Sequence, residues 1–345
     1  MARLAGTSPA VVSYVLNNGP RRVAPATRER VLRAVEQLGY RPNRIAASLR
    51  TNRTMSLGLV VPDNTNPYFA ELAREIEEVA FETGYALLLG NATDDVDRES
   101  AYVQAFLDRC VDGLILIPVH GVVPAAEEIA RTGTPWVVLD RLLEGRDAPA
   151  QVLSDNQRGG QMATEHLIEH GRKKIACISG PREMRNTSDR VRGWRDALNN
   201  AGFDADSGPL REVPLGRFAG REAALDILTR NNDVDAIFVA SDEQAVGVFR
   251  ALTELNLTCP RDIALVSFDG IAASLLTTPS LSTVCQPIGE LARIAVTLLL
   301  GQRENHASPQ GPTVLPVDLV TRGSCGCPET PFSSANSAST PGGKQ

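Results

Sequence analysis

The 345-residue sequence lacks the marks of several protein classes. Its longest apolar runs, such as AVTLLL and GLILIPV, are far shorter than the roughly 20 residues that span a bilayer. No basic segment followed by an apolar stretch opens the chain, so no secretory signal is expected. The patterns GxGxxG at the first strand turn, GxxxxGK followed by Ser or Thr, and GxSxG are also missing. These absences disfavour a membrane protein, an exported protein and the enzyme classes that those patterns mark.

Cysteine is scarce as well, with six residues in the whole chain. Cys110, Cys177 and Cys285 sit among apolar neighbours and are predicted to be buried, reduced thiols. Cysteines that form no paired framework in a small domain are typical of a cytoplasmic protein.

Lysine is absent from residues 1–54, yet the net charge there is strongly positive. Ten arginines against two glutamates give this segment a charge of +8, whereas the rest of the chain has 25 basic and 39 acidic residues, a charge of −14. A basic head on an acidic body is the pattern expected of a nucleic-acid-binding module. A solvated arginine-rich surface is the alternative, although the planar fork of arginine suits phosphate.

The head is predicted to be a small all-α domain with two helices after its first turn. Ser8 can cap the first of these helices, with Pro9 at its first position. The second follows at PATRERVLRAVEQLGY, where Leu32 and Leu38 are expected to face inward together with two valines. Short helices joined by such a turn form a helix-turn-helix, which by itself is a weak signal for DNA binding. The arginine excess strengthens it.

The segment RPNRIAASLRTNRT follows the head and contains a helix too short to be stable alone in water. We expect it to fold on a partner, with Leu49 as a wedge between base steps of an opened minor groove. The alternative is a plain linker in which Leu49 packs on the next domain.

From Ser56 onward, short apolar strands alternate with amphipathic helices. Strand-like runs include LGLVV, YALLLG, GLILIP, WVVLD, KIACISG, AIFVAS and IALVSFDG. This alternation predicts parallel sheets with helices on both faces. The strands are too many for one sheet, so we expect an α/β body of two doubly wound parallel-sheet subdomains with a cleft between them. The Ser-, Thr-, Pro- and Gly-rich tail from Cys325 is expected to be disordered.

Polar clusters follow several of these strands, and ligands of parallel sheets bind at the carboxyl ends of strands. Carboxylates and amides bind adjacent hydroxyls, and an aromatic ring can cover an apolar sugar face, so the clusters favour a polyol. For each acid the alternative is a helix cap or a partnered surface charge. The candidate residues are Asn66, Tyr68, Phe69, Asp140, Arg141, Arg190, Asp242 and Asp269.

Two pairs of residues raise the question of a metal. His166 and His170 have the i,i+4 spacing of metal ligands, but they close a helix before Gly171, where imidazoles more often lie in solvent. Cys325 and Cys327 lie in the expected tail, and two thiolates without further ligands make a poor zinc site. No metal and no cofactor are therefore predicted.

In this order and spacing, the segments AGTSPAVVSYVLNN, RPNRIAASLRTNRT, NPYFAEL, VDGLILIP, SFDG and VTRGS resemble the LacI/GalR family of bacterial transcription repressors, from Ala2 to about Ser324. The resemblance implies a homodimer on a pseudo-palindromic operator, with paired hinge helices that order on DNA. It assigns base reading to Pro9, Ala10 and Tyr14. The other DNA-binding positions that it implies, phosphate contacts and the minor-groove wedge, are Ser13, Asn17, Arg44, Leu49 and Arg50.

The resemblance also implies the domain organisation and the function. Residues 1–42 would be the DNA-binding domain, 43–54 the hinge, 55–324 the effector-binding and dimerisation domain, and 325–345 a tail. The effector domain would be periplasmic-binding-protein-like, with subdomains of 55–156 plus 286–315 and 157–285 plus 316–324. The expected function is that of a cytoplasmic repressor controlled by a small effector, with sugars favoured. A sugar receptor without DNA binding is the runner-up, and an enzyme comes third.

The sequence departs from the family in the head. Family members have several residues before the position of Met1, and Ala24 stands where they have a Ser or Thr cap. We expect the natural protein to begin a few residues upstream.

Overall fold

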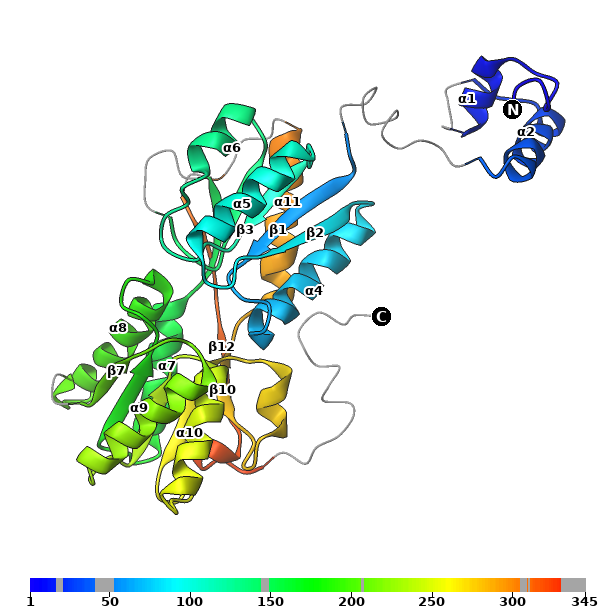
Figure 1. Cartoon of the computed structure of the whole chain (residues 1–345). Coiled ribbons are helices and arrows are strands. Elements are labelled where there is room, and N and C mark those ends of the chain that lie inside the picture. Colours follow the sequence, from blue (N-terminus) through cyan, green and yellow to red (C-terminus); the bar gives the residue numbers. More distant parts are fainter. Residues whose placement is uncertain are drawn as a thin grey trace. The chain divides into compact units, whose positions relative to one another are not determined.

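The computed structural model of the chain divides into two compact units, a head of Met1–Thr54 and a body of Met55–Gln345 (Figure 1). The structure describes residues 1–16, 21–40, 53–143, 149–205, 208–304, 309 and 311–329. Four of the predicted DNA-binding positions, Asn17, Arg44, Leu49 and Arg50, lie outside the described residues. In the part of the chain that is described, no helix combines the length and the apolar character needed to cross a membrane.

The head contains helices α1 (Pro9–Leu16) and α2 (Pro25–Gln37). The Oγ of Ser8 accepts a hydrogen bond from the Val11 amide at 3.3 Å, which confirms its predicted role as cap. A single hydrogen-bonded turn precedes α1. It closes at Gly6, whose φ of +59° allows the Thr7 amide to donate to the Ala2 carbonyl at 3.0 Å.

The core of the head consists of five small or β-branched side chains, Ala5, Val12, Val15, Val31 and Ala34. The prediction that Leu32 and Leu38 face this core is wrong, because 48% and 53% of these residues is exposed. Leu32 lies about 100° around the helix from Val31. Leu38 is the C-cap residue, beyond the last turn of α2.

The first sheet of the body has six parallel strands in the order β11-β5-β4-β3-β1-β2. Alternate residues of β1 point to opposite faces: Leu57 and Leu59 pack under helices α4 and α11, and Val60 packs under α5 and α6. The bounds are β1 Ser56–Val61, α4 Pro67–Glu82, β2 Ala86–Asn91, α5 Val96–Asp108, β3 Gly113–Leu116, α6 Ala126–Thr132, β4 Trp136–Leu139, β5 Ala150–Ser154, α11 Ile288–Arg303 and β11 Thr313–Leu315.

The second sheet has the order β12-β10-β9-β8-β6-β7 and is parallel except for β12, which is antiparallel to β10. Helices α7 and α8 cover one face, and α9 and α10 cover the other (Figure 1). The bounds are α7 Asn156–Glu169, β6 Ile175–Ser179, α8 Arg185–Asn200, β7 Leu210–Glu212, α9 Arg217–Arg230, β8 Ala236–Val239, α10 Asp242–Glu254, β9 Ala264–Asp269, η2 Ala272–Leu276, β10 Ser282–Cys285, β12 Asp318–Val320 and η3 Gly323–Cys325.

The predicted fold class is therefore confirmed: an α-helical head precedes an α/β body with two doubly wound sheets. The chain passes between the sheets three times, from β5 to α7, from β10 to α11 and from β11 to β12. Polar residues at the ends of strands and in these crossing segments are thereby brought together.

The prediction that disorder begins at Cys325 needs correction. Cys325 is fully buried at the end of η3, and the structure describes the chain as far as Glu329. The Oε1 of Glu329 accepts a hydrogen bond from the Ser280 amide at 2.8 Å. Burial of Cys325 in the apolar core under α7 keeps this part of the tail in place, which composition alone does not reveal.

Candidate functional site

Two aspartates at the carboxyl ends of strands have unusual backbone conformations. Asp140 follows β4 with φ of +66°, and Asp269 ends β9 with φ of +120°. Both are buried. Positive φ values are costly for residues other than glycine, and strained residues cluster at functional sites. Among the described non-glycine residues with positive φ, only these two are buried. These two positions are therefore the starting point for a candidate site.

Asp140 is the centre of a buried hydrogen-bond network. The hydroxyl of Tyr68, from α4, lies 2.9 Å from Oδ1 of Asp140 and 3.0 Å from Oε1 of Gln286. Asn186, from α8, donates to Oδ2 of Asp140 at 3.3 Å. Asn66 caps α4 by accepting a hydrogen bond from the Tyr68 amide at 3.0 Å, so it positions Tyr68. The network thus joins helices that cover different sheets.

The network continues to Asp269 through the crossing segment of Gln286. The side-chain Nε2 of Gln286 donates to Oδ1 of Asp269 at 2.9 Å, and Nη1 of Arg190 lies 3.4 Å from the same oxygen. Arg190 also donates from Nε to Asn156 at 2.8 Å, and its guanidinium stacks 3.7 Å from the ring centre of Phe268. A continuous chain of polar contacts therefore runs from Asn186 to Asn156 through both halves of the body.

Burial dominates the electrostatics of this network. It raises the pKa of Asp269 to about 8, although the charge of Arg190 opposes the shift. It also raises the pKa of Tyr68, and the nearby negative charge of Asp140 adds to this effect. Acceptors and donors held in a water-poor site can exchange their partners for the hydroxyl groups of a ligand.

A pocket of about 200 Å³ lies beside Asp140. Its lining includes Ser154, Asn156 and Asn186. The Oγ of Ser154 is buried and has no hydrogen-bond partner, which is uncommon for a buried hydroxyl. The pocket therefore adjoins the network at Asp140, Asn156 and Asn186.

Phe69 packs against Tyr68, and Arg141 in turn packs against Phe69. The ring of Phe69 packs edge-on against Tyr68, with 5.2 Å between ring centres, and the Arg141 guanidinium lies 5.7 Å from the centre of the Phe69 ring. Arg141 donates to the carbonyls of Pro118 and Val119. Burial lowers the pKa of its guanidinium. These contacts fix one end of the guanidinium, whereas its Nε is buried without a hydrogen-bond partner, so a ligand contact at Arg141 stays a prediction.

The carboxylate of Asp242 accepts its hydrogen bonds from groups of the protein itself. Its Oδ1 accepts from the hydroxyls of Ser267 and Thr283 at 2.5 and 2.7 Å, and its Oδ2 accepts from the amides of Gly270 and Ile271 at 2.9 Å each. Burial raises its pKa to about 6 despite these four hydrogen bonds. All four acceptor directions are used, so Asp242 fixes the loop after β9. It is neither a helix cap nor a surface charge, because it is buried and Ser241 caps α10.

Three residues of the network were not among the sequence candidates, namely Asn156, Asn186 and Gln286. Gln286 directly follows β10, so the rule that polar residues after strands gather in one place could have identified it. Asn186 is the second residue of α8, the helix that follows β6, so it does not directly follow a strand. Asn156 is the first residue of α7, directly after a crossing segment, so its position depends on the three-dimensional path of the chain.

The pH dependence of stability tests the ionisation of Asp269. Its folded pKa lies above the value of about 3.9 in an unfolded chain, so between these values the folded state keeps a proton that the unfolded state releases. The free energy of unfolding should therefore fall as the pH rises from about 4 to about 8, by up to about 1.4 kcal/mol per pH unit from this group. Urea unfolding across this window should give a flatter profile for Asp269→Asn. Asp97→Asn, an exposed control, should keep the wild-type slope. If the wild type and both variants gave parallel profiles, the raised pKa would not belong to Asp269.

In the head, the predicted base-reading residues lie on α1. Pro9 and Ala10 are exposed in its first turn, and Ser13 and Tyr14 are half-buried in the next. The side chains of Pro9 and Ala10 offer only apolar contact, for example with a thymine methyl group.

Two protein-family profiles match the chain. The profile described as "Bacterial regulatory proteins, lacI family" matches residues 1–43. The profile described as "Periplasmic binding protein-like domain" matches residues 164–325. The first covers the helix-turn-helix head and the second covers most of the second sheet and its helices.

Similar proteins match over most of the chain. The ribose operon repressor of Escherichia coli (strain K12) is 34% identical over 326 residues, which cover 94% of this chain and 98% of that repressor. The lac repressor dimer bound to operator and the anti-inducer ONPF superposes with a TM-score of 0.83 at 27% identity, covering 94% of this chain and 97% of that one. A LacI family transcriptional regulator from Enterococcus faecium with bound ribose superposes with a TM-score of 0.71 at 28% identity, covering 81% and 100%.

Proposed function

This chain belongs to the lacI family of bacterial regulatory proteins, and we propose that the buried network around Asp140 is where a sugar or sugar derivative binds and controls it. The chain is a DNA-binding transcriptional regulator with an effector. The observation that carries the proposed site is the chain of polar contacts from Asn186 through Asp140 and Asp269 to Arg190. It links both halves of the body, so a ligand bound to it would contact both.

The chemistry of the network favours a polyol. Asp140 and Asp269 can each accept hydrogen bonds from neighbouring hydroxyls, Asn186 and Arg190 can donate, and Tyr68 offers both a ring and a hydroxyl. The similar E. coli protein is a ribose operon repressor by name, and the E. faecium structure contains ribose. A pentose or hexose is therefore the effector class that we favour.

We also propose that the protein acts as a homodimer on double-stranded operator DNA in the cytoplasm, without catalysis. The lac repressor structure with which it superposes is a dimer on its operator. In each head, Pro9, Ala10 and Tyr14 would read bases, and Ser13 would contact phosphate together with Asn17, Arg44 and Arg50. Leu49 would enter the minor groove.

Coupling between the sites would arise from the contacts between the two halves of the body. Asn186 on α8 donates to Asp140, and Glu71 on α4 accepts a hydrogen bond from the Ala272 amide at 3.0 Å. An effector that changes these contacts would reposition one half against the other. In a dimer this would set whether the hinge segments can pair, typically with a coupling free energy of about 1–3 kcal/mol.

Fluorescence anisotropy of DNA fragments at controlled salt, repeated over a panel of pentoses and hexoses, tests the function. We expect at least one sugar to change specific DNA affinity by about 5–150-fold. Calorimetry of the same sugars measures binding to the body directly. A sugar that binds without altering DNA affinity would contradict the coupling. Sugar binding with no DNA affinity even at low salt would instead favour the sugar-receptor alternative.

A further inference from the structure

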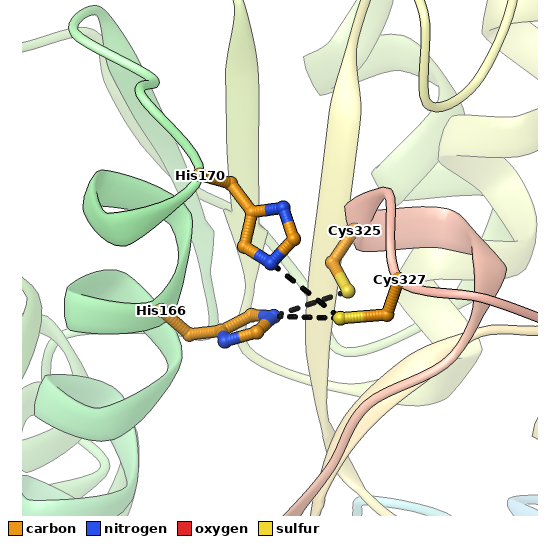
Figure 2. A group of neighbouring side chains, drawn as sticks. All are labelled: His166, His170, Cys325 and Cys327. Carbon is orange, nitrogen blue, oxygen red and sulfur yellow. Dashed lines mark hydrogen bonds between the residues drawn. The ribbon is translucent and has the colours of Figure 1, made fainter.

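A cluster of two histidines and two cysteines lies on the second sheet, apart from the polar network. His166 and His170 come from the end of α7, and Cys325 and Cys327 come from the segment after β12 (Figure 2). One ligand atom from each of the four residues lies within 4.8 Å of all the others. The histidine pair and the cysteine pair, which each have too few ligands for a metal site, thus lie together as one set of four.

The distances in the cluster are those of atoms that surround a common point. Nε2 of His166 lies 3.1 Å from Sγ of Cys325 and 3.6 Å from Sγ of Cys327, and Nε2 of His170 lies 3.4 Å from Sγ of Cys327. A tetrahedral zinc ion has bonds of about 2.0–2.3 Å, which place neighbouring ligand atoms roughly 3.3–3.8 Å apart. These three contacts lie within a few tenths of an ångström of those separations, and the remaining pairs of ligand atoms lie within 4.8 Å of each other.

The backbone holds the four side chains in this arrangement. The i,i+4 spacing puts both imidazoles on one face of α7, with 4.5 Å between ring centres. Gly326 has φ of +102°, a left-handed conformation that suits glycine and reverses the chain between the two cysteines. A side chain at Gly326 would also approach Nδ1 of His170 at 3.5 Å. Cys325 is buried beneath the cluster, whereas His170 is exposed, so the site has a supported base and an open approach for the ion.

We propose that His166, His170, Cys325 and Cys327 bind one Zn²⁺ ion. Two thiolates and two imidazoles form the Cys₂His₂ set of structural zinc sites, and this combination of ligands favours zinc over the hard cations Mg²⁺ and Ca²⁺. On binding, each cysteine thiol releases its proton to solvent, and the imidazoles bind in their neutral form. The proposal is independent of the effector site.

The role of the ion would be structural. Four protein ligands fill a tetrahedral shell and leave no position for a substrate or a water. The ion would join the end of α7 to the segment that follows β12, the only antiparallel strand among those described for this sheet. It would thereby fasten the segment after the last crossing to α7, the helix that follows the first crossing.

Metal content is the first measurement. Full-length protein without a histidine tag should contain about one zinc per chain after dialysis against a weak chelator. His170→Asn and Cys327→Ser alter the more exposed ligands and are the variants best able to preserve the fold. Loss of a neighbouring outer-shell group already costs 10–100-fold in affinity, so each variant should bind zinc at least about 100-fold more weakly in a chelator competition.

Matched controls are available elsewhere in the chain. The prediction that Cys110 is buried is wrong, since Cys110 is exposed, as is His120. Cys110→Ser and His120→Asn therefore change exposed residues outside the cluster and should keep the wild-type zinc content. Equal loss of zinc in these controls would identify adventitious binding and overturn the proposal. So would wild-type protein with no bound zinc after growth and purification with zinc supplied.

Two further readouts separate the metal site from other uses of the cluster. Cobalt in place of zinc should give thiolate-to-metal charge-transfer absorption that weakens in Cys327→Ser. Removal of zinc by a strong chelator should lower the melting temperature of the wild type but not of His170→Asn. A disulfide between Cys325 and Cys327 in protein kept under reducing conditions, detected by mass spectrometry, would contradict the proposal.

Discussion

Asp140→Asn is expected to weaken effector binding by at least about 100-fold. The substitution keeps the shape of the side chain, and asparagine tolerates the left-handed backbone that this position requires. It removes the charge and turns one acceptor into a donor that faces the donating amide of Asn186. Hydrogen bonds to a charged group contribute about 1.5–3 kcal/mol each, and each 1.4 kcal/mol is tenfold in affinity.

Calorimetric titration with the tightest-binding sugar of the panel measures this effect. Asp94→Asn is the matched control, because Asp94 also has positive φ, +55°, shortly after a strand but is exposed. It should bind the sugar as the wild type does. If Asp140→Asn retained wild-type affinity, the effector would have to bind elsewhere in the body.

The fold could be predicted from the sequence because its main signals are local. The alternation of apolar strands and amphipathic helices determined the doubly wound class, and the change of charge near Thr54 separated the head from the body. The orientation of α2 was harder to predict from the sequence. Whether Leu32 and Leu38 are covered depends on which neighbouring elements reach them, and helical spacing does not contain that information.

The candidate site was predictable only in part. Asp140, Asp242 and Asp269 look alike in sequence, since each follows a buried strand. Asp242 differs because Ser267 and Thr283, 25 and 41 residues further along the chain, saturate its carboxylate. Such partners come from neighbouring strands, so the order of strands in the sheet must be known before these aspartates can be told apart.

The histidine–cysteine cluster shows the same limit more sharply. In the sequence each pair was judged alone, and each alone is a poor metal site. The pairs are separated by about 160 residues, as the contact between His166 and Cys327 spans 161 positions. They meet because β12 joins the edge of the second sheet beside α7. The composition of the tail had instead predicted that the chain is disordered from Cys325.

Gly193→Ala is expected to lower the free energy of unfolding by about 3 kcal/mol and to weaken effector binding as well. Helices α7 and α8 cross so closely that a Cβ at Gly193 would lie 2.0 Å from the Gln157 carbonyl oxygen and 2.6 Å from the Gln161 amide nitrogen. The opposite glycine, Gly160, has the same relation to the Arg190 carbonyl, at 2.2 Å. Backbone atoms cannot rotate away as side chains do, so the helices must separate, and such overpacking typically costs 1–3 kcal/mol or more.

The loss of effector affinity follows from the position of the binding residues. Asn186 and Arg190 both belong to α8, and their hydrogen bonds to Asp140, Asn156 and Asp269 are sensitive to a shift of the helix by about 1 Å. Urea unfolding and calorimetric titration with the same sugar measure the two effects. Gly121→Ala is the control, because the nearest atom to its Cβ would be 4.0 Å away, and it should change neither quantity. Undiminished stability of Gly193→Ala would mean that the two helices are further apart than the structure places them. Reduced stability with full sugar affinity would instead separate the packing of α8 from the effector site.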